Sequence, residues 1–367
     1  EMTSSLVGSE MCIRDRAASS YILTGLTPKT KYSVSIYNGD VKRGTRTFTT
    51  TESYPAGYDI VNVSDADMLN DIFANPANYI QDNGGNVVLV FANGSTTDYM
   101  GESMELTIPA DFKSVIFWGE SGDTKPVFMP KGLSMAGSHD LIRFYNLDLQ
   151  NTSSANDYIV NFNVEGTVGE ILIDNCNISK TRGVVRVQSD GAKGSIGSIN
   201  IDNCVLTDIG SYAIVQTKVS GFTLNSISLS NSTISTVNAG GVLITQQDNV
   251  NISIDACTFY NCVTSGKSFI DINKMSNVTV DVKNTIIGQL YSYTAESTIK
   301  ATSVKGIATT TNLFTTTDCP YNSGYEWGEI LSVSSTELFV NPAEGDFHIQ
   351  SASQSSVAGA GDPRWNE

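Results

Sequence analysis

The sequence reads ILIDNCNI at residues 171–178 and INIDNCVL at residues 199–206. The same arrangement, alternating apolar residues followed by an Asn position, returns along the chain. That position falls at residues 146, 175, 203, 231, 256 and 284, and only Ala256 replaces Asn. The steps between these positions are 29, 28, 28, 25 and 28 residues. Self-similarity at a fixed period of this length is the signature of a solenoid.

Within each copy the apolar residues alternate with polar ones, which is the period of a β-strand. The alternation stops at Asn, the non-glycine residue that best tolerates a left-handed backbone. A second apolar strand follows, as at residues 184–187 and 242–244. Three short strands and three turns per repeat predict an all-β fold, a single-stranded right-handed parallel β-helix. Residues 87–314 would form about eight coils, with equivalent residues about 4.8 Å apart and Asn amides bonded along the stack.

Other folds explain the pattern less well. Leucine-rich and helical repeats carry Leu-x-x-Leu or helical patterns, and the sequence has neither. A β-sandwich gives no reason for one Asn position at a fixed step.

The segments on either side of the repeat differ from it. Residues 51–86 are expected to be a linker and a capping helix, since residues 64–67 resemble a capping box and Pro76 ends the helical pattern. Such a helix would cover the open end of the first coil. After Phe314 the period is lost, so residues 315–367 are expected to form the C-terminal cap.

Composition limits the classes of function. Of the 367 residues 16% are charged, and the net charge is −16. The chain should therefore repel nucleic acid and anionic membranes. It has no apolar run long enough to span a membrane. Only two histidines and no Cys-x-x-Cys pair occur, which argues against zinc. We expect a monomer.

Three cysteines, Cys176, Cys204 and Cys257, follow the Asn position on different coils. Stacked side chains of parallel strands point the same way rather than at each other. We therefore favour buried free thiols, which behave as small hydrophobic groups, over a disulfide between neighbouring coils.

Two N-terminal segments resemble known sequences. Residues 17–50 resemble the last strands of a fibronectin type III domain, with Leu26-x-Pro28-x-Thr30-x-Tyr32 at its tyrosine corner. The resemblance implies a partial β-sandwich module. Residues 6–16 resemble a translated sequencing adapter, so residues 1–16 are expected to be non-native. The natural N-terminus, with any export signal, would then be missing.

The span from Gly57 to Trp365 resembles the pectin-lyase-like parallel β-helices of surface proteins from polysaccharide-degrading Gram-negative bacteria. The capping helix, the Asn column and the closing residues 361–365, Gly-Asp-Pro-Arg-Trp, carry the resemblance. It implies an extracellular or outer-surface location and a polysaccharide partner. Many of those proteins are lipoproteins, so a lipid anchor would belong to the missing N-terminus. No activity is implied, since one fold hosts many functions.

The catalytic motifs of related enzymes are absent. Polygalacturonases carry Asn-Thr-Asp, Asp-Asp, Gly-His-Gly and Arg-Ile-Lys, and the nearest match, Gly-Ser-His-Asp at residues 137–140, lacks the second glycine. Calcium-dependent lyases need several clustered acids and an Arg or Lys base. Hydrolysis needs two carboxylates at a set separation.

A first outward column of polar residues lies on the strand after the Asn turn. Amide, Arg and Lys groups bind sugar hydroxyls and uronate carboxylates, so this face is the predicted glycan-binding site. For a lyase, Arg186 or Lys300 would be the base and Asp271 would hold a metal, although one acid is few for calcium. The alternative is a plain solvated face. The predicted members are Asn161, Arg186, Gln188, Gln216, Thr245, Asp271, Asn273 and Lys300, with Asn163 and Lys218 close by.

A second column precedes the Asn position and contains Asp174, Asp202, Ser230, Asp255 and Lys283. Asp174 and Asp202 fall on adjacent coils, where two carboxylates would share a proton or attract a cation such as calcium. Lys283 is expected to pair with Asp255. The alternative is that these acids simply extend into water, where such pairs stabilise little.

Aromatic residues gather near the C-terminal end, at Tyr291, Tyr293, Tyr321, Tyr325 and Trp327. Their flat apolar faces could stack on sugar rings, but we favour a role in sealing the last coil.

The leading hypothesis is a secreted or surface-attached polysaccharide-binding β-helix that does not cleave its ligand. One alternative is a polysaccharide lyase that acts on uronate-containing glycans such as pectin. The other is a structural spacer or adhesin. No cofactor is expected, unless calcium binds at Asp174 and Asp202.

Overall fold

Each coil turns at the Asn position because the backbone is left-handed there. The φ angles are 55° at Asn146, 53° at Asn175, 51° at Asn203, 47° at Asn231 and 45° at Asn284. Asn adopts this region at little cost, whereas most side chains with a Cβ do not. The repeated Asn therefore fixes where one strand ends and the next begins.

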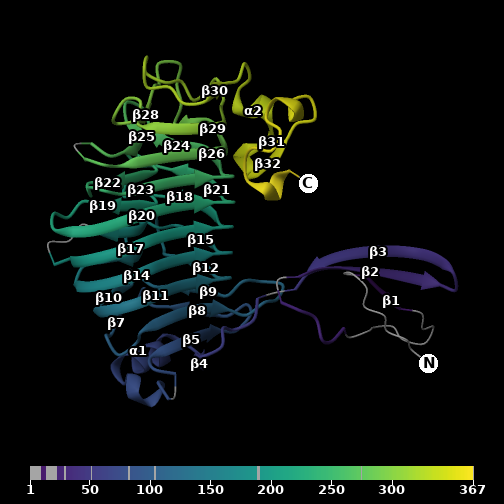
Figure 1. Ribbon diagram of the computed structural model, residues 1–367, viewed down its shortest axis with the longest axis vertical. Coiled ribbons are helices and arrows are strands. Elements are labelled where there is room, and N and C mark those ends of the chain that lie inside the picture. The colour runs from purple at the N-terminus through teal and green to yellow at the C-terminus, as the bar shows by residue number, and fades with distance from the viewer. Residues whose placement is uncertain are drawn as a thin grey trace. The chain divides into compact units, whose positions relative to one another are not determined.

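The fold is described from a computed structural model, shown in Figure 1. The described residues are 10–13, 23–28, 30–50, 52–81, 83–102, 105–187, 191–273 and 275–366. The chain divides into two units, Glu1–Gly57 and Tyr58–Glu367. The second unit is an all-β solenoid of about nine turns with parallel strands, which confirms the predicted fold class.

Strands of successive coils stack in parallel register in three stacks. The first stack contains β4 (Asp59–Val63), β5 (Asn86–Phe91), β8 (Ser114–Gly119), β11 (Gly137–Tyr145), β14 (Glu165–Asp174), β17 (Lys193–Asp202), β20 (Phe222–Ser230), β23 (Asn251–Asp255), β26 (Thr279–Ile287) and β29 (Ala308–Thr315). The second contains β6 (Thr96–Asp98), β9 (Val127–Met129), β12 (Asp148–Gln150), β15 (Asn177–Ser179), β18 (Val205–Ile209), β21 (Thr233–Val237), β24 (Thr258–Thr264) and β27 (Leu290–Tyr291). The third contains β7 (Thr107–Ile108) and β10 (Ser134–Met135), followed by β13 (Tyr158–Asn161), β16 (Gly183–Val187), β19 (Val215–Thr217), β22 (Leu243–Thr245), β25 (Ser268–Asp271) and β28 (Lys300–Thr302).

The solenoid begins earlier than the sequence pattern predicts. Strand β4 pairs in parallel with β5, so a strand of the first stack precedes the capping helix. The prediction of about eight coils starting at residue 87 was therefore too low, because residues 59–63 lack the Asn turn that marks later coils.

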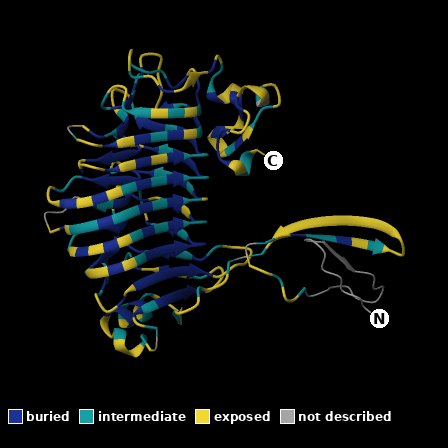
Figure 2. Cartoon of the chain, in the orientation of Figure 1, coloured by how far each residue is buried: buried dark blue, intermediate teal, exposed yellow. Residues whose placement is uncertain are grey.

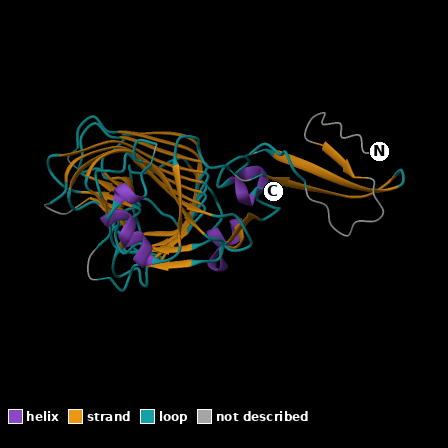
Figure 3. Cartoon of the chain, turned by 90° about the horizontal axis from the view of Figure 1, so that it is seen from below, coloured by secondary structure: helices purple, strands orange, loops and turns teal. Residues whose placement is uncertain are grey.

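Helix α1 (Ala66–Ala74), followed by the 3-10 turn η1 (Pro76–Asn78), covers the first coils, as Figure 3 shows. Asp65 accepts a hydrogen bond from the Met68 amide at the N-cap, which satisfies an otherwise free donor. On the buried face, Phe73 packs edge-on against Phe112 and Phe117, with ring centroids 5.6 and 6.5 Å apart. The helix thus extends the apolar core to the end of the solenoid.

The interior is filled by alternating side chains of the first stack, which appear as buried bands in Figure 2. Ile171, Ile199, Ile227 and Ile252 are stacked cross-strand neighbours, and each is at most 2% exposed. Burying such side chains stabilises the fold by about 1.5–3 kcal/mol each.

The Asn side chains form a partial ladder along the turn. Asn175 Nδ2 donates to Asn146 Oδ1 at 3.1 Å, and Asn203 Nδ2 lies 3.5 Å from Asn175 Oδ1. Asn312, which the sequence pattern did not reveal, donates to Asn284 Oδ1 at 3.0 Å. Where the amide column breaks at Ala256, Asp255 accepts from Asn284 Nδ2 at 2.9 Å instead.

A second ladder runs through the position after Asn, where the side chain is buried. The Cys176 amide donates to Cys204 Sγ at 3.4 Å, and the Cys204 amide donates to Ser232 Oγ at 3.0 Å. The Cys257 amide donates in the same way to Thr285 Oγ1 at 3.4 Å. Small Cys, Ser or Thr side chains therefore satisfy a buried amide of the neighbouring coil. The cysteines are free and buried, which confirms the preference over a disulfide.

The C-terminal residues do more than cap the end. Residues 331–366, here called the C-terminal strap, lie beside the last coils (Figure 1). Phe339 and Phe347 of the strap share a small apolar core with Tyr260 and Phe314 of the solenoid. The strap contains α2 (Ser335–Leu338), β31 (Phe339–Asn341), η2 (Pro342–Glu344), β32 (Asp346–Ile349), η3 (Gln354–Ser356) and η4 (Pro363–Trp365), and β30 (Glu329–Ile330) precedes it.

The closing segment of the strap bonds back to earlier coils. Buried Asp362 accepts a hydrogen bond from Thr233 Oγ1 at 2.6 Å, and Trp365 Nε1 donates to the same hydroxyl at 2.7 Å. Arg364 Nη2 donates to Asn203 Oδ1 at 3.1 Å. Gly361 has φ 86°, and a Cβ there would lie 2.9 Å from Thr258 Oγ1. The strap therefore fastens coils that are distant in sequence.

The first unit is a three-stranded sheet. Strand β2 (Lys31–Asn38) pairs in parallel with β1 (Glu10–Ile13), which lies within the adapter-like segment, and antiparallel with β3 (Val41–Thr49). The Thr27 amide donates to Tyr32 Oη at 2.8 Å. Ile36 and Val41 are exposed.

Replacing Asn284 by Ala should lower the free energy of unfolding by about 2 kcal/mol. The change removes two hydrogen bonds, to Asp255 and from Asn312, and puts Ala at a φ of 45°. Chemical denaturation of the purified protein would measure the loss.

Two further variants serve as comparisons for Asn284→Ala. Ser228→Ala, at a half-buried outward position, should change the stability by less than about 0.5 kcal/mol. Ala256→Asn should raise stability, since it places Asn where Ala now has φ 52°. Equal losses in Asn284→Ala and Ser228→Ala would contradict the role of the Asn turn.

The buried thiols should be unreactive in the folded protein. Burial raises the pKa of Cys176 and of Cys262 to about 12, so almost no thiolate forms near pH 8. In a Cys12→Ser variant, a thiol reagent at pH 8 should label no cysteine before unfolding and five afterwards. Rapid labelling of any of the five in the native state would show that the coils are not closed.

Candidate functional site

The outer face of the third stack carries the first predicted column, but its register differs from the prediction. Arg186 is the cross-strand neighbour of Asn161 and of Gln216, as expected. The next member is Ile244, not Thr245, and Asp271 follows it. Thr245 instead faces inward beside Thr217 and accepts its hydrogen bond at 2.7 Å. The polar column is therefore interrupted by a buried apolar residue.

Lys300 is also outside this column. It is paired with Ser268, three residues before Asp271, because the loop before β28 is longer than the regular repeat. Asp271 accepts from the Asn273 amide at 3.2 Å and lies three strands from Arg186, about 14 Å at strand spacing. The structure therefore does not bring Arg186, Asp271 and Lys300 together. Gln188 lies outside the described residues.

A hydrogen-bonded relay organises the N-terminal part of this face. Arg186 Nη1 donates to Asn161 Oδ1 at 2.8 Å, and Asn161 Nδ2 donates to Glu105 Oε1 at 2.7 Å. Asn163 Nδ2 donates to the other carboxylate oxygen of Glu105. Asn161 is only 4% exposed, so the relay holds the Arg186 guanidinium in place more than it offers groups to solvent.

Two tyrosines and a second arginine complete the cluster. The Arg186 Cζ atom lies 4.9 Å from the ring centroid of Tyr158 and 5.3 Å from that of Tyr212. Arg182 Cζ lies 4.3 Å from the Tyr212 ring, and the two rings meet edge to face at 5.4 Å. We call Arg182, Arg186, Tyr158 and Tyr212 the arginine site.

The arginine site is locally cationic in an acidic chain. Among the described residues, neither guanidinium forms an ion pair with a carboxylate. Arg186 Nε is buried and has no hydrogen-bond partner there. Burial raises the pKa of Tyr158, while the charges of Arg186 and Arg182 oppose that rise. The cluster thus keeps donor groups that can bind an anion.

The sequence pattern identified only part of the arginine site. Tyr158 lies at the start of β13, while Arg182 and Tyr212 lie in turns before β16 and β19, where the repeat does not specify side chains. The available signal was an aromatic or Arg residue at or shortly before the start of β13, β16 and β19. Glu105 gave no signal, because it lies in a loop about two coils earlier.

The acid column is arranged differently from the predicted cation site. Asp174 and Asp202 are cross-strand neighbours, as expected. Both Asp174 oxygens, however, accept from Arg143, at 2.9 and 2.7 Å, and this pair is largely buried. Asp202 accepts from Ser230 Oγ at 2.6 Å and Asn231 Nδ2 at 2.8 Å. The two carboxylates therefore have separate partners.

Lys283 was expected to pair with Asp255, and this is wrong. Its Nζ lies 2.5 Å from Asp281 on the same strand, two residues away and on the same outward face. Asp255 is instead occupied by the Asn284 amide. Within the described ranges, no group of three or more His, Cys, Asp or Glu residues is placed to hold a metal ion.

The C-terminal aromatic residues differ in burial, since Trp327 is buried and Tyr293 is exposed. Trp327 is 5% exposed and packs edge-on against Phe269, with centroids 5.7 Å apart. Tyr321 and Ile299 form an isolated parallel β-bridge through their backbones. The ring centroid of Tyr325 lies 4.8 Å from both Lys300 Nζ and Lys305 Nζ. The prediction of a sealing role therefore holds for Trp327.

Comparison with known proteins concerns the C-terminal part of the chain. Residues 252–365 match DUF5123, a domain of unknown function. The DUF5123 match begins in β23 and ends at Trp365, so it includes the last coils and the strap but not the arginine site. No curated protein matches the chain. No helix in the described residues is both long and apolar enough to cross a membrane.

Calcium should leave the melting temperature unchanged, because Arg143 already neutralises Asp174 and Asp202 accepts two hydrogen bonds. Thermal unfolding with millimolar calcium, and again with a chelator, would check this. A stabilisation by calcium that disappears in Asp174→Asn would instead restore the cation site that the sequence suggested.

Proposed function

We propose that this protein is a secreted or surface-attached polysaccharide-binding β-solenoid that binds an acidic glycan at the arginine site and does not cleave it. The observation that supports the proposal is the pair of arginines, stacked on two tyrosines, with no carboxylate partner among the described residues. In a chain with net charge −16, cations that lack acidic partners stand out as a candidate binding site.

The chemistry of the arginine site favours a uronate. A guanidinium donates two parallel hydrogen bonds to a carboxylate, which fixes its orientation. The partly exposed ring of Tyr212 adds flat apolar surface against which a sugar ring can pack. The relay through Asn161 to Glu105 holds Arg186 before the ligand arrives, which reduces the entropy lost on binding.

The negative net charge sets the conditions under which binding should be observed. At low salt the whole protein repels a polyanion, whereas at physiological ionic strength charges more than about 8 Å apart are largely screened. Close contacts at the arginine site are screened less. Binding is therefore best assayed at physiological salt.

The proposed setting rests on resemblance. The pectin-lyase-like β-helix and the fibronectin type III-like module point to an exported glycan-utilisation protein, and a lipid anchor would be consistent with that setting. The hydrogen bond from the Thr27 amide to Tyr32 Oη supports the interpretation of residues 26–32 as a tyrosine corner.

Arg186→Ala should weaken binding to polygalacturonate by about tenfold to a hundredfold, since a hydrogen bond to a charged group contributes about 1.5–3 kcal/mol. Tyr212→Ala should weaken it by a smaller factor through the lost stacking surface. Affinity gel electrophoresis or calorimetry at physiological salt, with dextran as the uncharged polymer, would measure both.

Two controls separate this proposal from its alternatives. Asp271→Ala should bind as well as the parent, because Asp271 lies three strands away, and Arg46→Ala controls for the loss of one surface charge. Ultraviolet-absorbing unsaturated product, lost in Arg186→Ala, would favour the lyase. Failure to retain any acidic glycan would contradict the proposal and favour a spacer or adhesin.

A further inference from the structure

A hollow lies beside the last coil. Inward positions of the first stack hold Ile252 and Ile254 on β23, then Val280 and Val282 on β26. On β29 the stacked positions are Ala308, which is smaller than Val280, and Thr310, which has the shape of Val282 but carries a hydroxyl. The lost volume leaves a hollow of about 100 Å³ beside these residues. We call it the end hollow.

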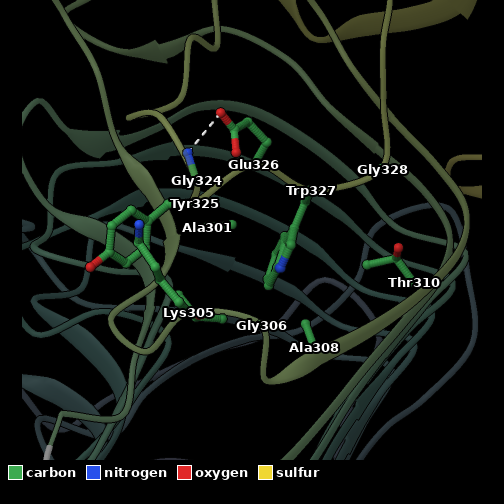
Figure 4. A pocket seen from close by; sticks show the side chains of 11 residues that line it. Ala301, Lys305, Gly306, Ala308, Thr310, Gly324, Tyr325, Glu326, Trp327 and Gly328 are labelled. Atoms are coloured by element: carbon green, nitrogen blue, oxygen red, sulfur yellow. Dashed lines mark hydrogen bonds between the residues drawn. The ribbon is translucent and has the colours of Figure 1, made fainter.

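The side chain of Trp327 lines the end hollow. Figure 4 shows its indole extending from the backbone toward Gly306 and Ala308, with Lys305 and Tyr325 on one side and Thr310 on the other. The side chain is 5% exposed, yet its Nε1 makes no hydrogen bond to any described residue. Nε1 is not fully buried, so a ligand or water in the hollow can accept a hydrogen bond from it.

Lys305 and Glu326 line the end hollow, and Lys300 lies next to it at the Tyr325 ring. Lys305 Nζ and Lys300 Nζ each lie 4.8 Å from the Tyr325 ring centroid. Within the described ranges neither lysine is in an ion pair. Glu326 is the one acid that lines the hollow, and its Oε1 accepts from the Gly324 amide at 2.9 Å.

Gly324 makes room for the Lys305 ammonium. It has φ 79°, and a Cβ there would lie 2.7 Å from Lys305 Nζ. Only glycine combines this backbone with such a close approach. The ammonium therefore lies against the Gly324 backbone at the edge of the hollow.

We propose that the end hollow binds the carboxylate end of a single uronic acid residue. The indole N–H of Trp327, the Lys305 ammonium and the Thr310 hydroxyl supply donors, and the Tyr325 ring provides an apolar face beside them. The volume of about 100 Å³ corresponds to about three waters, enough for a carboxylate and the adjacent ring carbons but not for an oligosaccharide. This end-group site is separate from the arginine site, and neither proposal requires the other.

Glucuronate titrated into 15N-labelled protein should shift the Trp327 indole N–H signal in a saturable way. Glucose has the same ring without the carboxylate and should leave the signal in place. The signals of Trp118 and Trp365 should not move. A Trp327→Phe variant identifies the signal.

Lys305→Gln should weaken the glucuronate affinity by about tenfold, because the charged donor to the carboxylate is lost. Lys305 is exposed, so this variant should fold normally. Lys193→Gln, on β17, removes an equally exposed charge and should bind as the parent does. Because the Trp327 indole signal reports binding in the end hollow, its titration is read separately from binding at the arginine site.

Three outcomes would overturn the proposal. One is a Trp327 signal that glucuronate does not shift. The second is an equal shift with glucose, which would remove the role of the carboxylate. The third is an unchanged affinity in Lys305→Gln.

Discussion

The fold depends on the left-handed Asn at the turn between the first and second stacks. An ordinary residue there would strain the backbone on every coil, and the strain would accumulate because the turn recurs about every 28 residues. Asn removes most of that cost and also offers an amide to the neighbouring coil. The turn, the ladder and the alignment of the inward side chains therefore have one cause.

The ends of the solenoid show what happens where this constraint weakens. At the N-terminal end, α1 supplies the apolar side chains that a further coil would supply. At the C-terminal end, Ala308 leaves space, and Trp327 is held beside it by contact with Phe269. The strap then bonds to Thr233 and Asn203, so the chain end is tied to coils more than a hundred residues away in sequence. The DUF5123 match includes both the strap and the end hollow.

The repeat predicted the parallel β-solenoid, the Asn turns and the buried thiols, because each follows from a local pattern. The register of the third stack was less predictable. Lys300 differs from expectation because a longer loop precedes its strand. Ile244 follows Gln216 at the regular step of 28 residues, and Thr245 was chosen in its place because the apolar pattern there is only a few residues long. Asn312 was missed since its coil has Ala308 and Thr310 where others have Ile or Val. The arginine site and its relay combine Glu105, Asn161 and Tyr212 from separate coils, and no spacing rule links such residues before the coils are stacked.

A double-mutant cycle on Asn146 and Asn175 tests the central claim most directly. These amides belong to adjacent coils and are joined by a hydrogen bond of 3.1 Å. Denaturation of both single alanine variants and the double variant should give a coupling energy of about 0.5–1.5 kcal/mol, whereas Asn146 with Asn231, three coils apart, should be additive. Full additivity for Asn146 and Asn175 would contradict the account, because the side chains could not then be stacked in one column.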